Sequence, residues 1–270
     1  MLATLGTVAL GFAIWLFVLR RYDRIEPESL RALLVAAFVG AGAFLVAAVA
    51  NEVVAQVLGV RADMSDRVGE VPLARIALFC LIVGFQEEIA KAVGAIVLTR
   101  RSGWLDEPVD GMLYAMTVAL GFAAAENLVY AQAHGSSVLL VRFLWPVPAH
   151  LGYAAVWGYG LARAHFHVPG GRSVLAASVV AAALLHGIAN FALLFQARYP
   201  LSPLVSLAAL VGLALLAHRR LRALVAESPF LEAGECSSCR NLNPPDRATC
   251  LYCGTDLIEH APPVAIARAS

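Results

Sequence analysis

The sequence contains little charge. Only 14% of its 270 residues are Asp, Glu, Lys or Arg, whereas 60% are hydrophobic, and the mean hydropathy is +0.74. This composition excludes an ordinary soluble domain and indicates a polytopic membrane protein buried in a lipid bilayer. The net charge is +1, and no basic cluster is interleaved with aromatic residues, so no nucleic-acid partner is expected.

Several catalytic signatures are also missing. The chain has no Gly-x-Ser-x-Gly, no His-Glu-x-x-His and no paired aspartates inside its apolar stretches. Serine, ordinary zinc and aspartyl protease arrangements therefore find no support.

What the chain does contain is long apolar stretches. At about 1.5 Å per residue in a helix, seven are long enough to cross a bilayer. They predict an all-α membrane protein with about seven transmembrane helices, at residues 2–19, 32–50, 76–98, 111–132, 138–162, 173–195 and 201–217.

The arginines predict the orientation of these helices. The first apolar stretch has no positive segment before it and is followed by Arg20 and Arg21, so we expect an uncleaved anchor rather than a signal peptide. Further arginines recur in alternate loops, at positions 100, 101, 163, 172, 219, 220 and 222. The positive-inside rule then predicts a multi-pass protein of the cell membrane, with its amino terminus outside and its carboxyl terminus in the cytoplasm.

Composition changes near residue 219, and four of the five cysteines follow. We expect a membrane domain at 1–220, a linker at 221–235, a small cysteine domain at 236–257 and a disordered tail at 258–270. The spacing Cys236-x-x-Cys239, ten residues, Cys250-x-x-Cys253 is typical of a zinc ribbon. Two disulfides are the alternative, but a reducing cytosol favours thiolates that hold structural Zn²⁺.

Three ionisable residues interrupt the stretch at 76–98. Glu87, Glu88 and Lys91, the only lysine, lie near its centre. Each such charge costs roughly 2.5 to 3.5 kcal/mol at a bilayer centre, so it needs a partner or a function. Lys91 is three and four residues from the two glutamates and can reach either. Its ammonium favours the charged form of one carboxylate, while burial favours protonation of the other, as general acid and base catalysis requires.

Other polar residues are expected at a similar depth. His150 and His186 fall near the midplane of their stretches, level with Glu87, and Asn190 follows His186 by one helical turn. Glu126 should lie a turn or more outward, where pairing with an arginine such as Arg142 is an alternative to a catalytic role. A base, a charge that tunes it and donors for an oxyanion are what the addition of water to a peptide carbonyl requires.

At these residues the chain resembles the PrsW family of intramembrane proteases, within the group that includes the CAAX-prenyl proteases. The matching segments are Glu87-Glu88-Ile-Ala-Lys91, Asp110-Gly111, Phe122-Ala-Ala-Ala-Glu126-Asn127, Pro148-Ala-His150 with Gly158-Tyr-Gly160, and His186-Gly-Ile-Ala-Asn190.

The resemblance implies a membrane protease whose relatives cleave anti-sigma factors, and therefore a single-pass membrane protein as substrate. It implies that Glu87 activates water, that Glu88 and Lys91 set its electrostatic environment, and that His186 with Asn190 forms the oxyanion site.

Two further positions are implied less directly. His150 would be another catalytic or water-orienting group. CAAX proteases place a histidine four residues after the phenylalanine, where this chain has Glu126, so Glu126 or His150 could orient the water. The zinc ribbon lies outside the resemblance, and a cytosolic protein is its possible partner.

The leading hypothesis is thus a glutamate-type endopeptidase that uses no catalytic metal. A zinc-dependent version, with His150, His186 and a glutamate as ligands, would hydrolyse the same peptide bond with a metal-activated water. Two other classes are a proton-coupled transporter that uses the buried carboxylates as a relay, and a scaffold that presents the ribbon to its partner.

Overall fold

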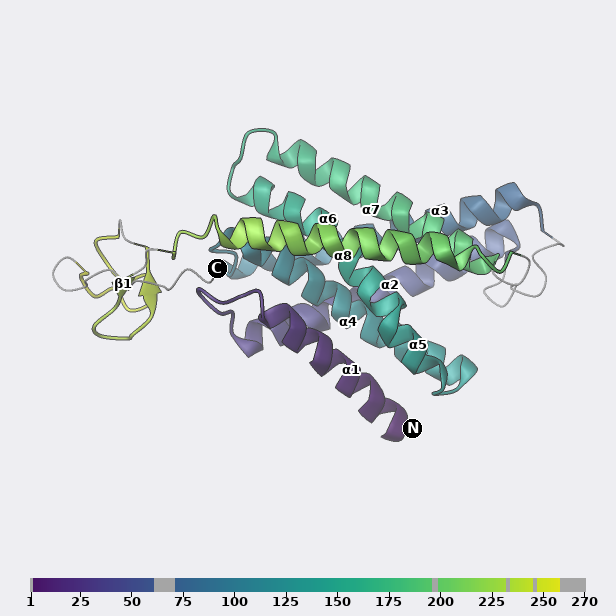
Figure 1. Ribbon diagram of the computed structural model, residues 1–270, viewed down its shortest axis with the longest axis horizontal. Helices are drawn as coiled ribbons and strands as arrows, with labels where there is room; N and C mark the ends of the chain where they lie inside the picture. Colours follow the sequence, from purple (N-terminus) through teal and green to yellow (C-terminus); the bar gives the residue numbers. More distant parts are fainter. Residues whose placement is uncertain (1, 61–70, 196–198, 232–233, 245–246, 258–270) are drawn as a thin grey trace.

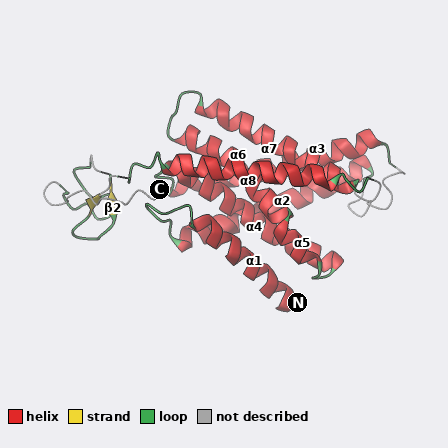
Figure 2. Cartoon of the chain, in the orientation of Figure 1, coloured by secondary structure: helices red, strands yellow, loops and turns green. Residues whose placement is uncertain are grey.

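The computed structural model describes residues 2–60, 71–195, 199–231, 234–244 and 247–257, and the predicted tail at 258–270 lies outside these ranges. The helices cross one another, with α8 along the length of the molecule and α1 and α5 inclined to it, and the small C-terminal domain extends from one end (Figures 1 and 2). The helices are α1 (Leu2–Arg20), α2 (Leu30–Leu58), α3 (Leu73–Ser102), α4 (Pro108–His134), α5 (Val138–Leu144), α6 (Pro146–His165), α7 (Gly171–Leu194) and α8 (Pro203–Val225). Two short antiparallel strands follow, β1 (Gly234–Glu235) and β2 (Leu242–Asn243).

This architecture confirms the predicted all-α membrane protein. Within the described residues, six segments are long and apolar enough to cross a bilayer: α1, α2, α4, α5 together with α6, α7 and α8. Helix α3 is equally long, but every stretch of bilayer length within it contains at least three charged residues. The predicted span at 76–98, which lies in α3, is therefore not among these six segments.

Several helices extend beyond the predicted apolar stretches; α2 continues to Leu58, whereas we predicted that its stretch ends at 50. Two further differences concern the fifth and the last stretch. The fifth apolar stretch breaks at Trp145, because Pro146 lacks an N–H and disfavours helical geometry in the residue before it. Helix α8 continues to Val225, whereas we predicted that its membrane-spanning stretch ends at 217 and that a linker begins at 221. The first residues of the expected linker are therefore helical.

Helix α4 is the centre of the bundle and packs against α2 and α6, while α3 packs against α7. Glycines allow the α3–α7 approach that builds the site. A Cβ atom at Gly84 would lie 2.5 Å from the carbonyl oxygen of Ala183, and one at Gly187 would lie 2.8 Å from the Cα atom of Leu81. Larger residues would therefore force α3 and α7 apart.

Candidate active site within the helix bundle

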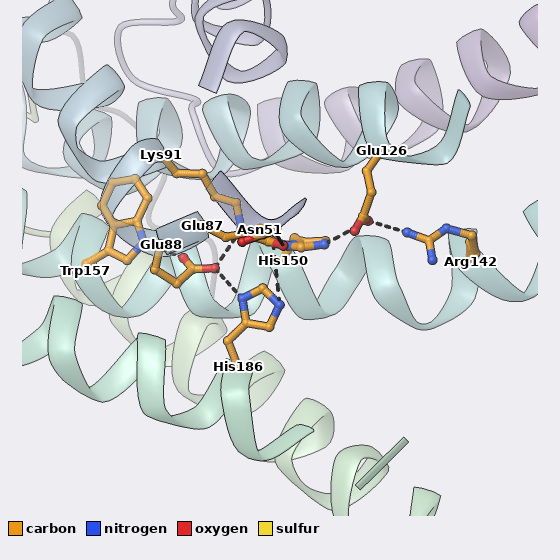
Figure 3. A network of polar contacts seen from close by, with 9 residues as sticks. All are labelled: Asn51, Glu87, Glu88, Lys91, Glu126, Arg142, His150, Trp157 and His186. Atoms are coloured by element: carbon orange, nitrogen blue, oxygen red, sulfur yellow. Dashed lines mark hydrogen bonds and ion pairs between the residues drawn. The ribbon is translucent and has the colours of Figure 1, made fainter. Parts of the chain in front are cut away.

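The ammonium group of Lys91 is the centre of a buried polar network on α3 (Figure 3). Its Nζ atom lies 2.7 Å from Oε1 of Glu88 and 2.9 Å from Nδ1 of His150 on α6, and 4.1 Å from the ring centre of Phe122 on α4. Lys91 and Glu88 are completely buried. The ion pair and the aromatic ring replace the water that both charges lose.

Glu87 and His186 face each other across α3 and α7 (Figure 3). Oε2 of Glu87 lies 3.8 Å from Nε2 of His186 and, among the described residues, this buried oxygen has no hydrogen-bond partner. The other ring nitrogen of His186, Nδ1, lies 2.9 Å from Oε1 of Glu88. A carboxylate only accepts, so Nδ1–H donates and Nε2 is left facing Glu87.

His150 joins this network to a second ion pair. Because the Lys91 ammonium only donates, Nδ1 of His150 accepts and its Nε2–H donates to Oε2 of Glu126, at 3.2 Å. Glu126 is also ion-paired with Arg142 on α5, and Arg142 donates to the side chain of Asn127 at 2.6 Å. The predicted pairing of Glu126 with Arg142 is thus present, together with a contact to His150.

The structure adds residues that sequence reasoning missed. Asn51 on α2 donates to Oε1 of Glu87 at 3.1 Å, and the indole of Trp157 on α6 donates to Oε2 of Glu88 at 3.0 Å. Tyr153 stacks on the ring of His186, with ring centres 4.8 Å apart. A lone Asn or Trp in an apolar stretch is a weak signal, because its partner is known only after the helices pack.

Six of the seven predicted site residues therefore lie in one network: Glu87, Glu88, Lys91, Glu126, His150 and His186. The seventh, Asn190, lies one turn beyond His186 on α7 and is half-buried. It makes no hydrogen bond to the other six within the described part of the chain.

The donor atoms of Glu87, His150 and His186 all lie within 4.8 Å of one another, close enough to hold a metal ion. Glu87 and His186 each offer a donor atom that makes no hydrogen bond in the described residues. His150 fits less well, because Lys91 occupies one ring nitrogen and Glu126 the other. The nearby ammonium would also repel a cation.

The four ribbon cysteines form a separate cluster that could hold a metal ion. Sγ of Cys236 lies 3.7 Å from that of Cys253, and Sγ of Cys239 lies 3.5 Å from that of Cys250. A tetrahedral ion with bonds of about 2.3 Å to sulfur separates its ligands by about 3.8 Å, whereas a disulfide bond needs about 2.05 Å. The geometry therefore fits four thiolates around one ion.

These features define a class: an α-helical membrane protein whose buried carboxylates and histidines are shared between α3, α4, α6 and α7. Comparison with known proteins then gives the family. Residues 28–217, well over half of the chain, match the family described as PrsW family intramembrane metalloprotease, and the chain belongs to this family.

Curated relatives share part of this region. The chain is 37% identical over 94 residues to Protease PrsW of Geobacillus kaustophilus, which is 35% of this chain and 42% of the relative. It is 33% identical over 125 residues to Protease PrsW of Shouchella clausii (46% and 58%) and 36% identical over 111 residues to that of Bacillus subtilis (41% and 51%). The chain thus spans about half the length of these relatives. No solved structure matches it.

Proposed function

We propose that the chain is an intramembrane endopeptidase in which Glu87 activates water. One observation carries this proposal: Oε2 of Glu87 is buried, lacks a hydrogen bond among the described residues and faces Nε2 of His186 at 3.8 Å. A water molecule about 2.8 Å from both atoms fits that separation. Membership of a family of intramembrane proteases agrees with this reading.

In the proposed reaction, Glu87 takes a proton from the water as its oxygen bonds to the peptide carbonyl carbon. The carbonyl electron pair moves to its oxygen, and a protonated Nε2 of His186, with Asn190 one turn away, stabilises that oxyanion. Glu87 then returns the proton to the amide nitrogen as the C–N bond breaks. Glu88 and Lys91 hold His186 and His150 in position and balance the charge.

Glu126 acts at a distance in this scheme. Arg142 and His150 both contact its Oε2 atom, which leaves that atom no place for a reacting water. We infer that Glu126 fixes the ring of His150, and that His150 in turn orients Lys91.

A metal-dependent peptidase is the second candidate, favoured by the proximity of Glu87, His150 and His186 and by the description of the family. These residues would hold the ion, which would polarise the carbonyl and lower the pKa of bound water. Zinc content of the purified full chain separates the two candidates. The metal-free mechanism predicts one zinc per chain, lost in Cys239→Ser, whereas the metallopeptidase predicts a second zinc that Glu87→Gln removes.

Cleavage itself is tested by co-expressing a panel of single-pass membrane proteins with the wild type, Glu87→Gln, His186→Ala and the control Glu52→Gln. Glu52 is an exposed carboxylate on α2 outside the network, so its variant should cleave normally. Cleavage by the wild type and the control alone is the expected result. Cleavage that survives both site substitutions contradicts the proposal.

The remaining assignments follow the same proposal. The substrate is a single-pass membrane protein, with anti-sigma factors as candidates from the family resemblance. The amino terminus lies outside the cell membrane, and the ribbon lies in the cytoplasm, holds structural Zn²⁺ and binds a cytosolic protein. Arg20, Arg100 and Arg222 at the same ends of α1, α3 and α8 support this orientation.

A further inference from the structure

Five carboxylates gather at the end of the bundle from which the ribbon extends, far from the proposed active site along the helices. Two come from the loop between α1 and α2, and three from the start of α4. All are buried except Asp106, which is half-buried; the five are Asp23, Glu28, Asp106, Glu107 and Asp110.

Asp110 belongs to two overlapping groups of three carboxylates in this acidic cluster. Oxygens of Asp23, Glu107 and Asp110 lie within 4.8 Å of one another, and so do oxygens of Glu28, Asp106 and Asp110. The side chain of Asp110 is completely buried. Carboxylate oxygens at these separations can bind the same ion.

Backbone N–H groups occupy one oxygen of Asp110 and one oxygen of Asp23. Oδ2 of Asp110 accepts the backbone N–H groups of Asp106 and Glu107, at 3.1 and 2.8 Å, and Oδ2 of Asp23 accepts that of Glu28 at 2.6 Å. The Oδ1 atoms of Asp23 and Asp110 are buried and, in the described parts of the chain, have no hydrogen-bond partner. Such buried acceptors are rare unless a ligand satisfies them.

The cluster also lacks a compensating charge. No ion pair to these five carboxylates is present among the described residues. Arg20 is near, but it donates to the backbone carbonyl of Glu28, at 3.4 Å. The cluster is therefore a buried set of carboxylate oxygens with which no cationic side chain of the described residues forms an ion pair.

We propose that the acidic cluster binds one hard divalent cation of the Mg²⁺ and Ca²⁺ class, held by Asp23, Glu107 and Asp110. Ligands that are all oxygen select these ions over zinc or copper. Glu28 and Asp106 contribute charge from the other side of Asp110, and water completes the coordination.

Such an ion would connect three segments of the protein. Asp23 belongs to the α1–α2 loop, Glu107 and Asp110 to the start of α4, and Ser228, just after α8, donates to the side chain of Glu107. The ribbon contacts the same loop, where the hydroxyl of Tyr252 lies 2.7 Å from Oε1 of Glu26. The cation would thus hold in place the α1–α2 loop that the ribbon contacts.

The test uses full-length protein with its ribbon loaded with zinc, and Mn²⁺ as a spectroscopically visible ion of the same class. Electron paramagnetic resonance should show one bound Mn²⁺ per chain, displaced by Mg²⁺ or Ca²⁺. Asp23→Asn should weaken binding about tenfold or more, since ligand charge sets affinity, while its asparagine oxygen still accepts the N–H of Glu28. Glu227→Gln, an exposed carboxylate paired with Arg163, is the matched control and should bind normally.

Thermal unfolding gives the second measurement. Mg²⁺ should raise the unfolding temperature of the wild type and of Glu227→Gln but not that of Asp23→Asn. Without metal, Asp23→Asn should unfold at or above the temperature of the wild type, because it removes a buried repulsion. Mn²⁺ binding that is equal in Asp23→Asn and the wild type, or that disappears instead in Glu87→Gln, would overturn the assignment. So would the absence of any bound Mn²⁺ in the wild type.

Discussion

Nζ of Lys91 on α3 lies 2.9 Å from Nδ1 of His150 on α6, and this contact determines which ring nitrogen of His150 carries the proton. A donor on one side of the ring requires an N–H on the other, which points at Glu126. His150 is therefore a neutral bridge between two ion pairs, Glu88 with Lys91 and Glu126 with Arg142. The bundle buries these charges because each one contacts an opposite charge.

The first prediction concerns Glu88, which accepts hydrogen bonds from Lys91, His186 and Trp157. Glu88→Gln leaves the Lys91 ammonium buried without its closest counter-charge, so we expect a loss of about 3 to 5 kcal/mol in the free energy of unfolding. Denaturant unfolding in detergent measures it. The double variant Glu88→Gln/Lys91→Met should recover part of the loss, and a double variant less stable than Glu88→Gln would show that the pair is not coupled.

The second prediction separates Glu87 from Glu126. Glu126→Gln keeps an oxygen that Arg142 and His150 can contact, so cleavage should fall by no more than about tenfold, whereas Glu87→Gln removes the base and should cost about 10²- to 10⁴-fold. The measurement is the cleavage rate of one membrane substrate with each purified variant. Equal losses in the two variants would place Glu126 among the groups that contact the reacting water.

Much of this network was predictable because charge in an apolar stretch is rare. Glu87, Glu88 and Lys91 stand out for that reason, and residue counting placed His150 and His186 at their depth. The partners that depend on packing were not predictable. In the sequence Trp157 is indistinguishable from a packing residue, and only the folded structure shows that its N–H points toward Glu88. Likewise, the role of Asn51 is known only once α2 packs beside Glu87.

The fold, like the network, could be predicted from the sequence only in part. Apolar length predicted the membrane helices because a bilayer imposes that length. It did not predict the break at Trp145, which depends on the proline that follows. Nor did it predict the acidic cluster, because Asp23 and Asp110 are far apart in the sequence and meet only when the α1–α2 loop packs against the start of α4.

The third prediction tests the close approach of α3 to α7. Gly84→Ala places a methyl group 2.5 Å from the carbonyl oxygen of Ala183, so the helices must separate and carry Glu87 away from His186. A displacement of about 1 Å at a reacting group can cost about 10²-fold in rate. Cleavage should therefore fall by about that factor.

Gly42 provides the matched control for this substitution. A Cβ atom at Gly42 on α2 meets nothing within 4 Å, so Gly42→Ala should leave cleavage unchanged. Circular dichroism should report the same helix content for both variants. Full activity in Gly84→Ala would show that the site tolerates a wider separation of α3 and α7.

The last prediction concerns the ribbon, which is too small to fold on its hydrophobic core. Each knuckle is closed by backbone hydrogen bonds, from the N–H of Cys236 to Asn241 at 2.9 Å and from that of Cys250 to Thr255 at 2.7 Å. These turns only position the sulfurs, so the metal must supply the folding energy.

Cys239→Ser should release one zinc per chain and make 234–257 sensitive to protease. Cys80→Ser, which changes a buried cysteine on α3, should retain the zinc. Because the hydrogen bond from Tyr252 to Glu26 is the one that joins the ribbon to the membrane domain among the described residues, the helices should keep their unfolding temperature. A ribbon that resists protease after losing its zinc would show that its fold is independent of the metal.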